Sequence, residues 1–238
     1  MVKMVQESFT ILTPVEGEAI FCRIEEAART CYQSSHKVAP GSAKVFVENI
    51  MKFGHESVLE HVVITVRFIT NRGMTHELVR HRIGIAFSQE STRFCDYCGD
   101  KFGNEITVID QREHIMDFLA PEGHQHSSIA ETKECANSGC SACKKIMHAI
   151  ADWTMAMACC EDSYKKLRTD GLPAEYARDA LPNDLKTDIV VTANLREWRH
   201  IFKLRTAKKA HFNIRGLMRK LCEEFKKSIP IIFDDIKW

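Results

Sequence analysis

Apolar residues recur along this chain with two different periods, which predict alternating helices and strands. Between residues 16 and 32 they return every three or four positions, which favours a helix. The segment HVVITVRFIT at 61–70 instead alternates and is rich in β-branched residues, as expected for a strand. By the same two criteria we expect helices over 43–53, 74–82, 144–168, 173–181, 194–204 and 207–228, and further strands over 105–110 and 187–193.

Turn-forming residues mark the ends of several elements and one long interruption. Gly54 and Gly171 are placed to end two helices, and Asn194 with Glu197 three positions later has the form of a capping box. Residues 120–142 are rich in turn-forming types and predict a loop or a variable, cysteine-containing insertion. No repeat or linker is evident, so we expect one α+β domain over residues 1–238, with a mixed sheet and flanking helices.

The composition narrows the classes of protein to which this fold can belong. Hydrophobic residues make up 45% of the 238 residues and charged ones 27%, as expected for a well-buried core. The formal net charge of +1 argues against a protein that coats nucleic acid without sequence preference. Charged residues interrupt every apolar run, and the first residues lack the apolar core of a signal peptide. We therefore expect a cytoplasmic protein without a membrane partner.

Two neighbouring polar motifs supply many hydrogen-bond donors. Residues 80–82, RHR, place two guanidinium groups and an imidazole side by side, which suits a phosphate, a pyrophosphate or an electron-rich ring. A solvated, charged helix end is the alternative interpretation. Residues 88–93, SQESTR, add hydroxyl, amide and guanidinium groups to a segment whose backbone N–H groups could form an anion site, although ordinary polar turns share this composition.

Two further motifs lie elsewhere in the sequence. The segment NLREWRHIFKLR at 194–205 predicts an amphipathic helix with one cationic side, for which a basic face turned to solvent is the alternative. The segment GHESVLEH at 54–61 gathers histidines and glutamates just before a strand. Its two histidines are six positions apart, which is not the spacing of the helical H-E-x-x-H metal motif, so a metal site there is not expected.

In this order the four motifs resemble the flavin-dependent thymidylate synthases, also called thymidylate synthase-complementing proteins. The matching segments are GHESVLEH, RHRIGIAFSQESTRF, AEYARDALP and NLR…HIFKLR, within residues 20–109 and 173–215. The resemblance implies a flavoprotein methyltransferase of dTMP biosynthesis. NADPH would reduce FAD, and a one-carbon unit would pass from methylenetetrahydrofolate to C5 of dUMP. It also implies a homotetramer whose sites are shared between subunits.

The resemblance further implies roles for residues at the matching positions. The FAD site would comprise His55, Ser57, Arg80, His81, Arg82, Gln89, Asn194, Arg196 and His200. The dUMP site would comprise Glu77, Arg80, Gln89, Glu90, Ser91, Thr92, Arg93, Arg178 and Arg205, with Arg178 at the phosphate. Arg205 would be the catalytic residue, because its guanidinium would stabilise negative charge on the uracil ring and no cysteine nucleophile would be needed.

The sequence departs from the family pattern at a few positions. The loop between Arg82 and Ser91 is one residue longer, and Ala86 occupies the place of a serine. Glu77 stands where glutamine is frequent, and Lys209 stands where histidine is common. A flavin- and nucleotide-binding paralogue with impaired turnover is therefore an alternative to the active enzyme.

The ten cysteines raise a separate question. In a reducing compartment they would be thiols or metal ligands rather than disulfides. Cys95 with Cys98 and Cys140 with Cys143 form two C-x-x-C pairs, which predict a zinc site, and Cys135, His124 and His126 lie nearby in the sequence. Incidental thiols in a variable insertion are the alternative. The last alternative is a nucleic-acid-binding protein whose fold is stabilised by zinc, which the near-zero net charge disfavours.

Overall fold

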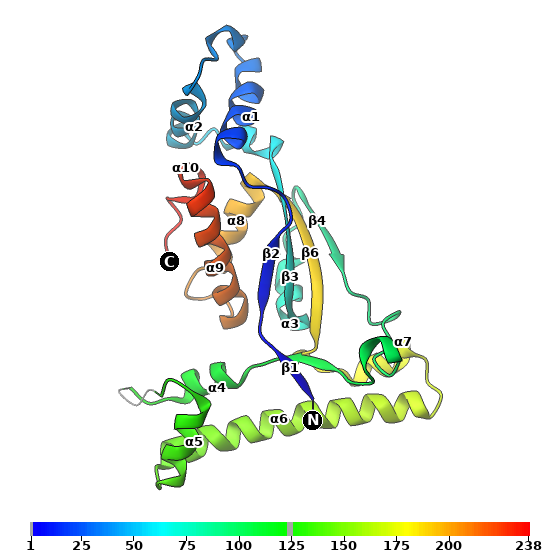
Figure 1. The fold of residues 1–238 in the computed structure, drawn as a ribbon. Helices are drawn as coiled ribbons and strands as arrows, with labels where there is room; N and C mark the ends of the chain where they lie inside the picture. The colour runs from blue at the N-terminus through cyan, green and yellow to red at the C-terminus, as the bar shows by residue number, and fades with distance from the viewer. Residues whose placement is uncertain (1, 123–125) are drawn as a thin grey trace. The chain divides into compact units, whose positions relative to one another are not determined.

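The computed structural model describes residues 2–122 and 126–238, and the chain divides into two compact units (Figure 1). Unit 1 comprises residues 1–7, 70–73 and 90–187, and unit 2 comprises residues 8–69, 74–89 and 188–238. The chain passes between the units several times, so each unit is assembled from segments that are distant in sequence. No change in composition along the chain marks these crossings.

The sheet on which unit 2 is built has the strand order β2-β3-β6-β4. Its strands are β2 (Ser8–Ile11), β3 (Val63–Asn71), β6 (Lys186–Asn194) and β4 (Ile85–Gln89). β2 pairs antiparallel with β3, and β4 pairs antiparallel with β6. Alternate residues of β3, namely Ile64, Val66 and Phe68, are fully buried, which explains the alternating sequence pattern.

Helices share one apolar core with this sheet, and the core contains a cluster of aromatic rings. They are α1 (Gly17–Thr30), α2 (Ser42–Phe53), α3 (Arg72–Leu78), α8 (Leu195–Arg205), α9 (Phe212–Ser228) and α10 (Pro230–Phe233), with the 3₁₀ turns η1 (Ser35–Lys37) and η2 (Glu56–His61). Figure 1 shows α8 and α9 side by side next to the sheet. Trp198 and Phe202 of α8 pack against Phe225 of α9 with ring centroids 5.3–5.7 Å apart, and all three side chains are fully buried. This cluster fixes the position of α8.

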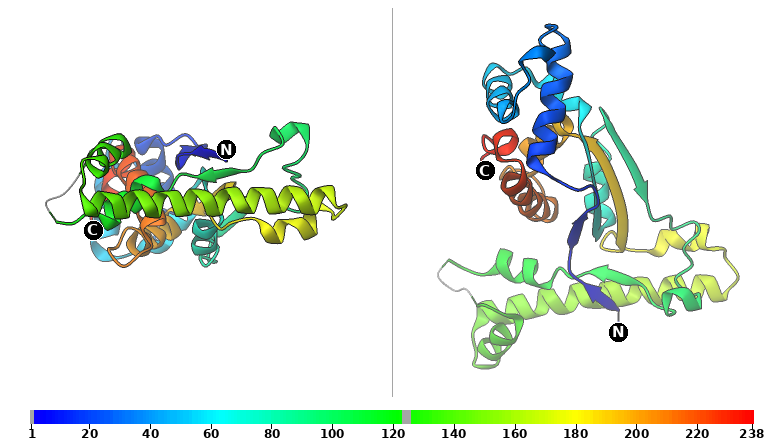
Figure 2. Two further views of the ribbon diagram at one scale, coloured as in Figure 1. Left: turned by 90° about the horizontal axis from the view of Figure 1, so that it is seen from below. Right: turned by 45° about the horizontal axis from the view of Figure 1, so that its top comes forward.

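Unit 1 is organised along the long helix α6 (Ser141–Thr169). Its other elements are β1 (Lys3–Val5), η3 (Asp100–Phe102), β5 (Thr107–Ile109), α4 (Arg112–Leu119), α5 (Ile129–Asn137), α7 (Ala174–Ala177) and η4 (Arg178–Ala180). β1 and β5 pair in parallel. Figure 2 shows α5 beside the N-terminal end of α6 and α7 near its C-terminal end. Among the described residues, no helix has the length and apolar character needed to cross a membrane.

Most of the elements expected from the periodicity are confirmed. The expected strands correspond to β3, β5 and β6, and the expected helices over 16–32, 43–53, 144–168 and 194–204 correspond to α1, α2, α6 and α8. Gly54 and Gly171 follow their helices with φ of 71° and 95°, a backbone conformation that favours glycine. The helix expected over 173–181 is divided into α7 and η4.

Other expectations are wrong in their boundaries or missed an element. The helix expected over 74–82 ends at Leu78, so RHR lies in the connection that follows it, and the helix expected from 207 begins at Phe212. Part of the segment expected to be a loop, 120–142, forms α5, whose first turn is capped by the Ser128 hydroxyl accepting from the Glu131 N–H at 3.3 Å. Strands β1, β2 and β4 and helix α4 were not expected, because each is short and has a weak period.

Candidate functional site

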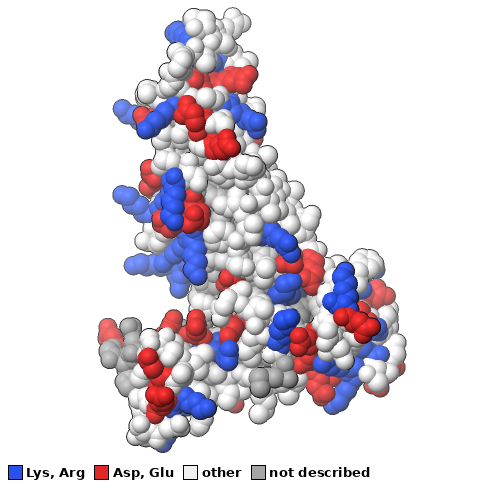
Figure 3. Space-filling model, viewed as in Figure 1, with Lys and Arg blue, Asp and Glu red and all other residues white. Residues whose placement is uncertain are grey.

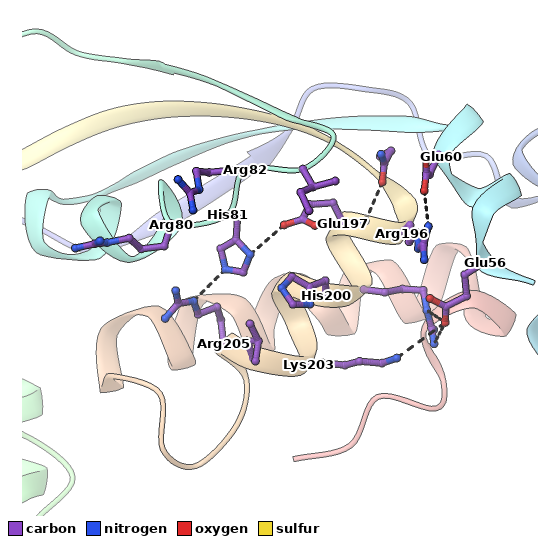
Figure 4. A pocket seen from close by; sticks show the side chains of 14 residues that line it. Glu56, Glu60, Arg80, His81, Arg82, Arg196, Glu197, His200, Lys203 and Arg205 are labelled. Atoms are coloured by element: carbon purple, nitrogen blue, oxygen red, sulfur yellow. Dashed lines mark hydrogen bonds and ion pairs between the residues drawn. The ribbon is translucent and has the colours of Figure 1, made fainter. Parts of the chain in front are cut away.

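A cavity of about 670 Å³ opens in unit 2 between the RHR segment and helix α8 (Figure 4). Its cationic side chains are Arg80, Arg82, Arg196, Arg199, Lys203 and Arg205, and its carboxylates are Glu56, Glu60 and Glu197. On the face of the molecule seen in Figure 3, by contrast, lysines and arginines are interspersed with aspartates and glutamates. The excess of cations in one cavity makes it a site suited to an anionic ligand.

The N-terminus of α8 is held beside the RHR segment by a close backbone approach. Asn194 is the N-cap, and its side-chain oxygen accepts from the Glu197 N–H at 2.8 Å. The Asn194 N–H donates to the Gly84 carbonyl at 3.1 Å. A Cβ on Gly84, whose φ is 65°, would lie 2.1 Å from the Asn194 amide nitrogen, so only glycine fits there. Half of the expected capping box is confirmed, while the Glu197 carboxylate bonds elsewhere.

Glu197 bonds His81, which in turn contacts Arg205. The His81 ring is 4% exposed, and its Nδ1 lies 3.0 Å from a Glu197 carboxylate oxygen. Its Nε2 accepts from Arg205 Nε at 3.1 Å, and because a guanidinium can only donate, Nδ1 carries the ring proton. Burial, followed by the charges of Arg205 and His200, lowers the pKa of His81 to about 4. His81 is therefore neutral at working pH and orients Arg205.

Arg205 is the best-anchored cation that faces the cavity from the C-terminal end of α8. Besides His81, its guanidinium donates to the Glu77 backbone carbonyl at 2.8 Å and to the Glu77 carboxylate. Its side chain is 17% exposed, so part of it remains accessible from the cavity. The three contacts hold the planar guanidinium group of Arg205 in one orientation, while the Glu77 carboxylate partly neutralises its charge.

Ion pairs join further residues of α8 to the carboxylates of η2 at the cavity. Arg196 donates to Glu60 at 2.6 Å. Arg199 was expected on a cationic side of the helix, but its side chain is 2% exposed and bonds Asp235 at 2.7 Å and Glu56 at 3.1 Å. Burial alone would lower the pKa of Arg199, and the two carboxylates raise it overall. Arg199 thus joins α8 to the C-terminal segment and to η2.

Not every residue expected in the FAD site lines this cavity. Arg80, His81, Arg82, Asn194, Arg196 and His200 do, although they come from two segments more than a hundred residues apart. His55 and Ser57 are exposed and flank the lining residue Glu56, and Gln89 donates to the Thr75 hydroxyl at 3.0 Å. The lining residues Glu56, Glu60, Glu197, Arg199 and Lys203 were not assigned, although the first two lie in the GHESVLEH motif and the other three in the 194–205 segment.

The expected dUMP residues are divided between the two units. Glu77, Arg80, Gln89 and Arg205 belong to unit 2, whereas Glu90, Ser91, Thr92, Arg93 and Arg178 belong to unit 1. Within unit 1 the Ser91 carbonyl accepts from two backbone N–H groups, and Thr92 is buried. Arg93 pairs with Glu175 of α7 at 3.3 Å, which brings it near the turn that carries the exposed Arg178.

Glu90 has partners that limit its availability to a ligand. Its carboxylate accepts from the Tyr97 hydroxyl at 2.7 Å and pairs with Lys186 at 3.1 Å. Burial, followed by this hydrogen bond, raises the pKa of Tyr97, which keeps the phenol protonated as a donor. These contacts give Glu90 a structural role in unit 1.

A family model described as "Thymidylate synthase complementing protein" matches residues 21–231. The chain belongs to this family. A "Flavin-dependent thymidylate synthase" of Geobacter sulfurreducens is 33% identical over 220 residues, which cover 88% of this chain and 78% of the relative. A protein of Pyrococcus furiosus with the same description is 31% identical over 206 residues, covering 86% and 69% of the two chains. The family expected from the four motifs is confirmed.

A solved structure supports the fold. It is described as a UMP/dUMP methylase, PolB, from Streptomyces cacaoi bound with 5-Br UMP. The two folds agree with a TM-score of 0.70 over 98% of this chain and 95% of the other, at 19% sequence identity. The expected α+β fold is thereby confirmed. The expectation of a methyltransferase is confirmed separately, by the family model and the flavin-dependent thymidylate synthase relatives.

The two C-x-x-C pairs of this family member are not brought together. Cys95 and Cys98 flank Tyr97, whose N–H donates to the Tyr164 hydroxyl at 3.4 Å in the C-terminal half of α6. Cys140 and Cys143 lie at the opposite end of the same helix. Because the helix rises about 30 Å between Cys143 and Tyr164, the four thiols do not meet at one ion within a chain. Of the nearby candidate ligands, His124 lies outside the described residues.

Proposed function

We propose that this chain is a cytoplasmic, flavin-dependent thymidylate synthase that converts dUMP to dTMP. FAD would be its bound cofactor, NADPH its reductant and methylenetetrahydrofolate its one-carbon donor. The observation that carries the proposal is the cavity itself, which gathers the RHR segment, the N-cap of α8 and Arg205 around one space in a member of this family. A homotetramer, as the resemblance implies, is part of the proposal and is tested by light scattering in solution.

The side chains of the cavity fit a flavin dinucleotide. Arg82 and Arg80 are exposed at one side, and Arg196 and His200 are exposed at another. Guanidinium groups offer paired donors that match the oxygens of a pyrophosphate. When bound, the flavin supplies the redox chemistry of one-carbon transfer. The protein groups bind and orient the ligands, and Asn194 contributes by fixing the start of α8.

Arg205 has the chemistry required to activate a uracil ring. Its guanidinium keeps its proton at any working pH, so it cannot remove a proton as a general base. A fork that is already oriented by His81 and the Glu77 carbonyl can donate to a ring oxygen and stabilise negative charge that develops on the ring. This role requires no cysteine nucleophile beside the substrate.

Flavin binding is the first test of the proposal. The purified protein should show the visible absorption of bound flavin, or bind added FAD with micromolar or tighter affinity, on the order of −8 kcal/mol. Arg82→Ala should weaken FAD binding by roughly 10–100-fold, because a charge-assisted hydrogen bond contributes about 1.5–3 kcal/mol, and should weaken dUMP binding less. Arg23→Ala, which removes another exposed arginine, on α1 outside the cavity, is the control. Folded protein that fails to bind FAD in a titration would contradict the flavin assignment.

A second prediction concerns the departure at Glu77 and the impaired paralogue that it suggests. Glu77→Gln keeps the side-chain length but removes the charge that neutralises Arg205. We expect dUMP-dependent release of tritium from C5-labelled substrate to rise by up to about fivefold, because a half-exposed ion pair contributes ~1 kcal/mol or less. Glu26→Gln, which removes an exposed carboxylate of α1, should leave the rate unchanged. A rate that falls in Glu77→Gln would mean that this carboxylate is needed to orient Arg205.

A further inference from the structure

Four side chains with metal-binding atoms converge where α5 meets α6 in unit 1. The Nε2 atom of His126 lies 3.2 Å from the Cys143 sulfur. The ligand atoms of His126, Cys135 and Cys143 all lie within 4.8 Å of one another. The Cys140 thiol is in side-chain hydrogen-bond contact with both Cys135 and Cys143. Two thiols and one imidazole therefore face a common point, and the Cys140 thiol lies beside the two thiols.

The local backbone explains why these residues meet. Cys140 is the N-cap of α6, and Cys143 lies in its first turn, so the C-x-x-C spacing turns both thiols to one side. Gly139, with φ of 105°, reverses the chain after α5, and the Cys140 N–H donates to the Cys135 carbonyl at 3.3 Å. This tight turn brings Cys135, near the end of α5, beside the C-x-x-C pair.

We propose that Cys135, Cys140, Cys143 and His126 bind one zinc ion. A tetrahedral zinc ion with Zn–S bonds of about 2.3 Å and Zn–N bonds of about 2.0–2.1 Å sets its ligand atoms roughly 3.5–3.8 Å apart. The ligand atoms of His126, Cys135 and Cys143 reach this spacing with small side-chain movements, and the neighbouring Cys140 thiol would complete the set. The set of three cysteines and one histidine is a known structural zinc combination. The metal site expected from the sequence thus keeps Cys140 and Cys143 and exchanges Cys95 and Cys98 for Cys135 and His126.

The position of the cluster indicates a structural rather than a catalytic ion. Four protein ligands leave no open coordination position for a substrate. The apolar core shared by α4, α5 and α6 is small, with Met116, Ile146 and Ile150 as its buried members. A metal ion supplies stability where such a core is too small to hold helices together. Zinc would therefore fasten α5 to the start of α6, and this role does not depend on the proposed thymidylate synthase activity.

A second group of candidate ligands does not carry a metal proposal. His81, Glu197 and His200 also have ligand atoms within 4.8 Å of one another. The Arg205 guanidinium, however, donates to His81 at 3.1 Å, and its positive charge opposes binding of a cation there. That group belongs to the anionic-ligand cavity described above.

The test measures metal content in the full chain rather than activity. Protein purified without chelators under reducing conditions should contain about one zinc per chain by elemental analysis. His126→Gln and Cys140→Ser each remove one ligand and should weaken zinc binding by more than ~10-fold in a competition titration with zinc alone. Cys95→Ser and Cys98→Ser are matched controls from the other C-x-x-C pair, and they should keep the full zinc content. Removal of zinc by a chelator should lower the melting temperature.

Three outcomes would overturn this assignment. One is a folded, reduced protein that contains no zinc and takes up none in the titration. Another is full zinc content in both His126→Gln and Cys140→Ser. The third is loss of zinc in Cys95→Ser or Cys98→Ser, which would instead indicate the four-cysteine set, brought together between chains. Because Cys143 is fully buried, Cys143→Ser is not used as the deciding variant.

Discussion

Arg205→Ala is expected to slow dTMP formation by about 10²–10³-fold, or roughly 3–4 kcal/mol of transition-state stabilisation. The variant should still bind FAD and still be reduced by NADPH, because the RHR segment and the N-terminal half of α8 remain in place. The three contacts that orient the guanidinium reach Glu77 and His81, and neither residue belongs to the apolar core of unit 2. The Arg205→Ala variant should therefore fold normally and lose only a hydrogen-bond donor that is already oriented in the wild-type cavity. Flavin reduction and dTMP formation are measured separately on one preparation.

The mechanism also predicts the behaviour of two further substitutions. Arg205→Lys keeps the positive charge but lacks the planar fork, so it cannot donate to His81 and Glu77 in the same geometry and should also be impaired. Serine in place of any one of the ten cysteines should not abolish turnover through loss of a nucleophile. Normal turnover by Arg205→Ala, together with a folded but inactive cysteine variant, would show that this mechanism is incorrect.

Trp198→Ala is expected to lower the free energy of unfolding by about 3–5 kcal/mol. The Trp198 side chain is fully buried, its ring stacks 5.7 Å from that of Phe202, and its indole N–H donates to the Ile64 carbonyl at 3.0 Å. Alanine leaves a large cavity at the contact between α8 and the sheet, and it leaves that carbonyl without its donor. Urea unfolding followed by circular dichroism measures the loss.

A matched tryptophan provides the control for this prediction. Trp238 is 37% exposed and lies against Lys226, with the ammonium 4.2 Å from the ring centroid. Trp238→Ala should therefore cost about 1 kcal/mol or less. FAD binding should weaken in Trp198→Ala and not in Trp238→Ala, because the first substitution loosens the helix that carries Arg196 and His200. Equal losses of stability in the two variants would mean that Trp198 does not anchor α8.

Elements with a long and local pattern could be predicted from the amino-acid sequence alone. β3 could be predicted because one face of the strand packs in the core and the other does not, so burial leaves a period of two in nine residues. α8 could be predicted because its N-cap, Asn194, and its apolar positions Leu195, Trp198, Ile201 and Phe202 lie within one helix length, and the four apolar side chains are fully buried. Each family motif is also a short stretch of neighbouring residues, so it can be recognised without knowledge of the tertiary structure.

Which of these local segments lie side by side depends on packing between residues that are distant in sequence. β4 is a strand because it pairs with β6, whose residues lie about a hundred positions later, and five residues of weak alternation do not reveal such a partner. Arg199 was expected on a cationic side of the helix, but Asp235 and Glu56 approach it from elsewhere in the chain and allow its burial.

The cysteines show the same limit at the proposed zinc site. Spacing identifies a C-x-x-C pair, since the two thiols are joined by one turn of backbone. The other ligands of the site depend on which residues pack at each end of α6. The length of this helix separates Cys143 from Cys95 and Cys98. The reversal at Gly139 instead brings Cys135 and His126 to Cys143. The spacing of Cys140 and Cys143 in the sequence thus places their thiols together, whereas the packing of α5 on α6 determines which other ligands lie beside them.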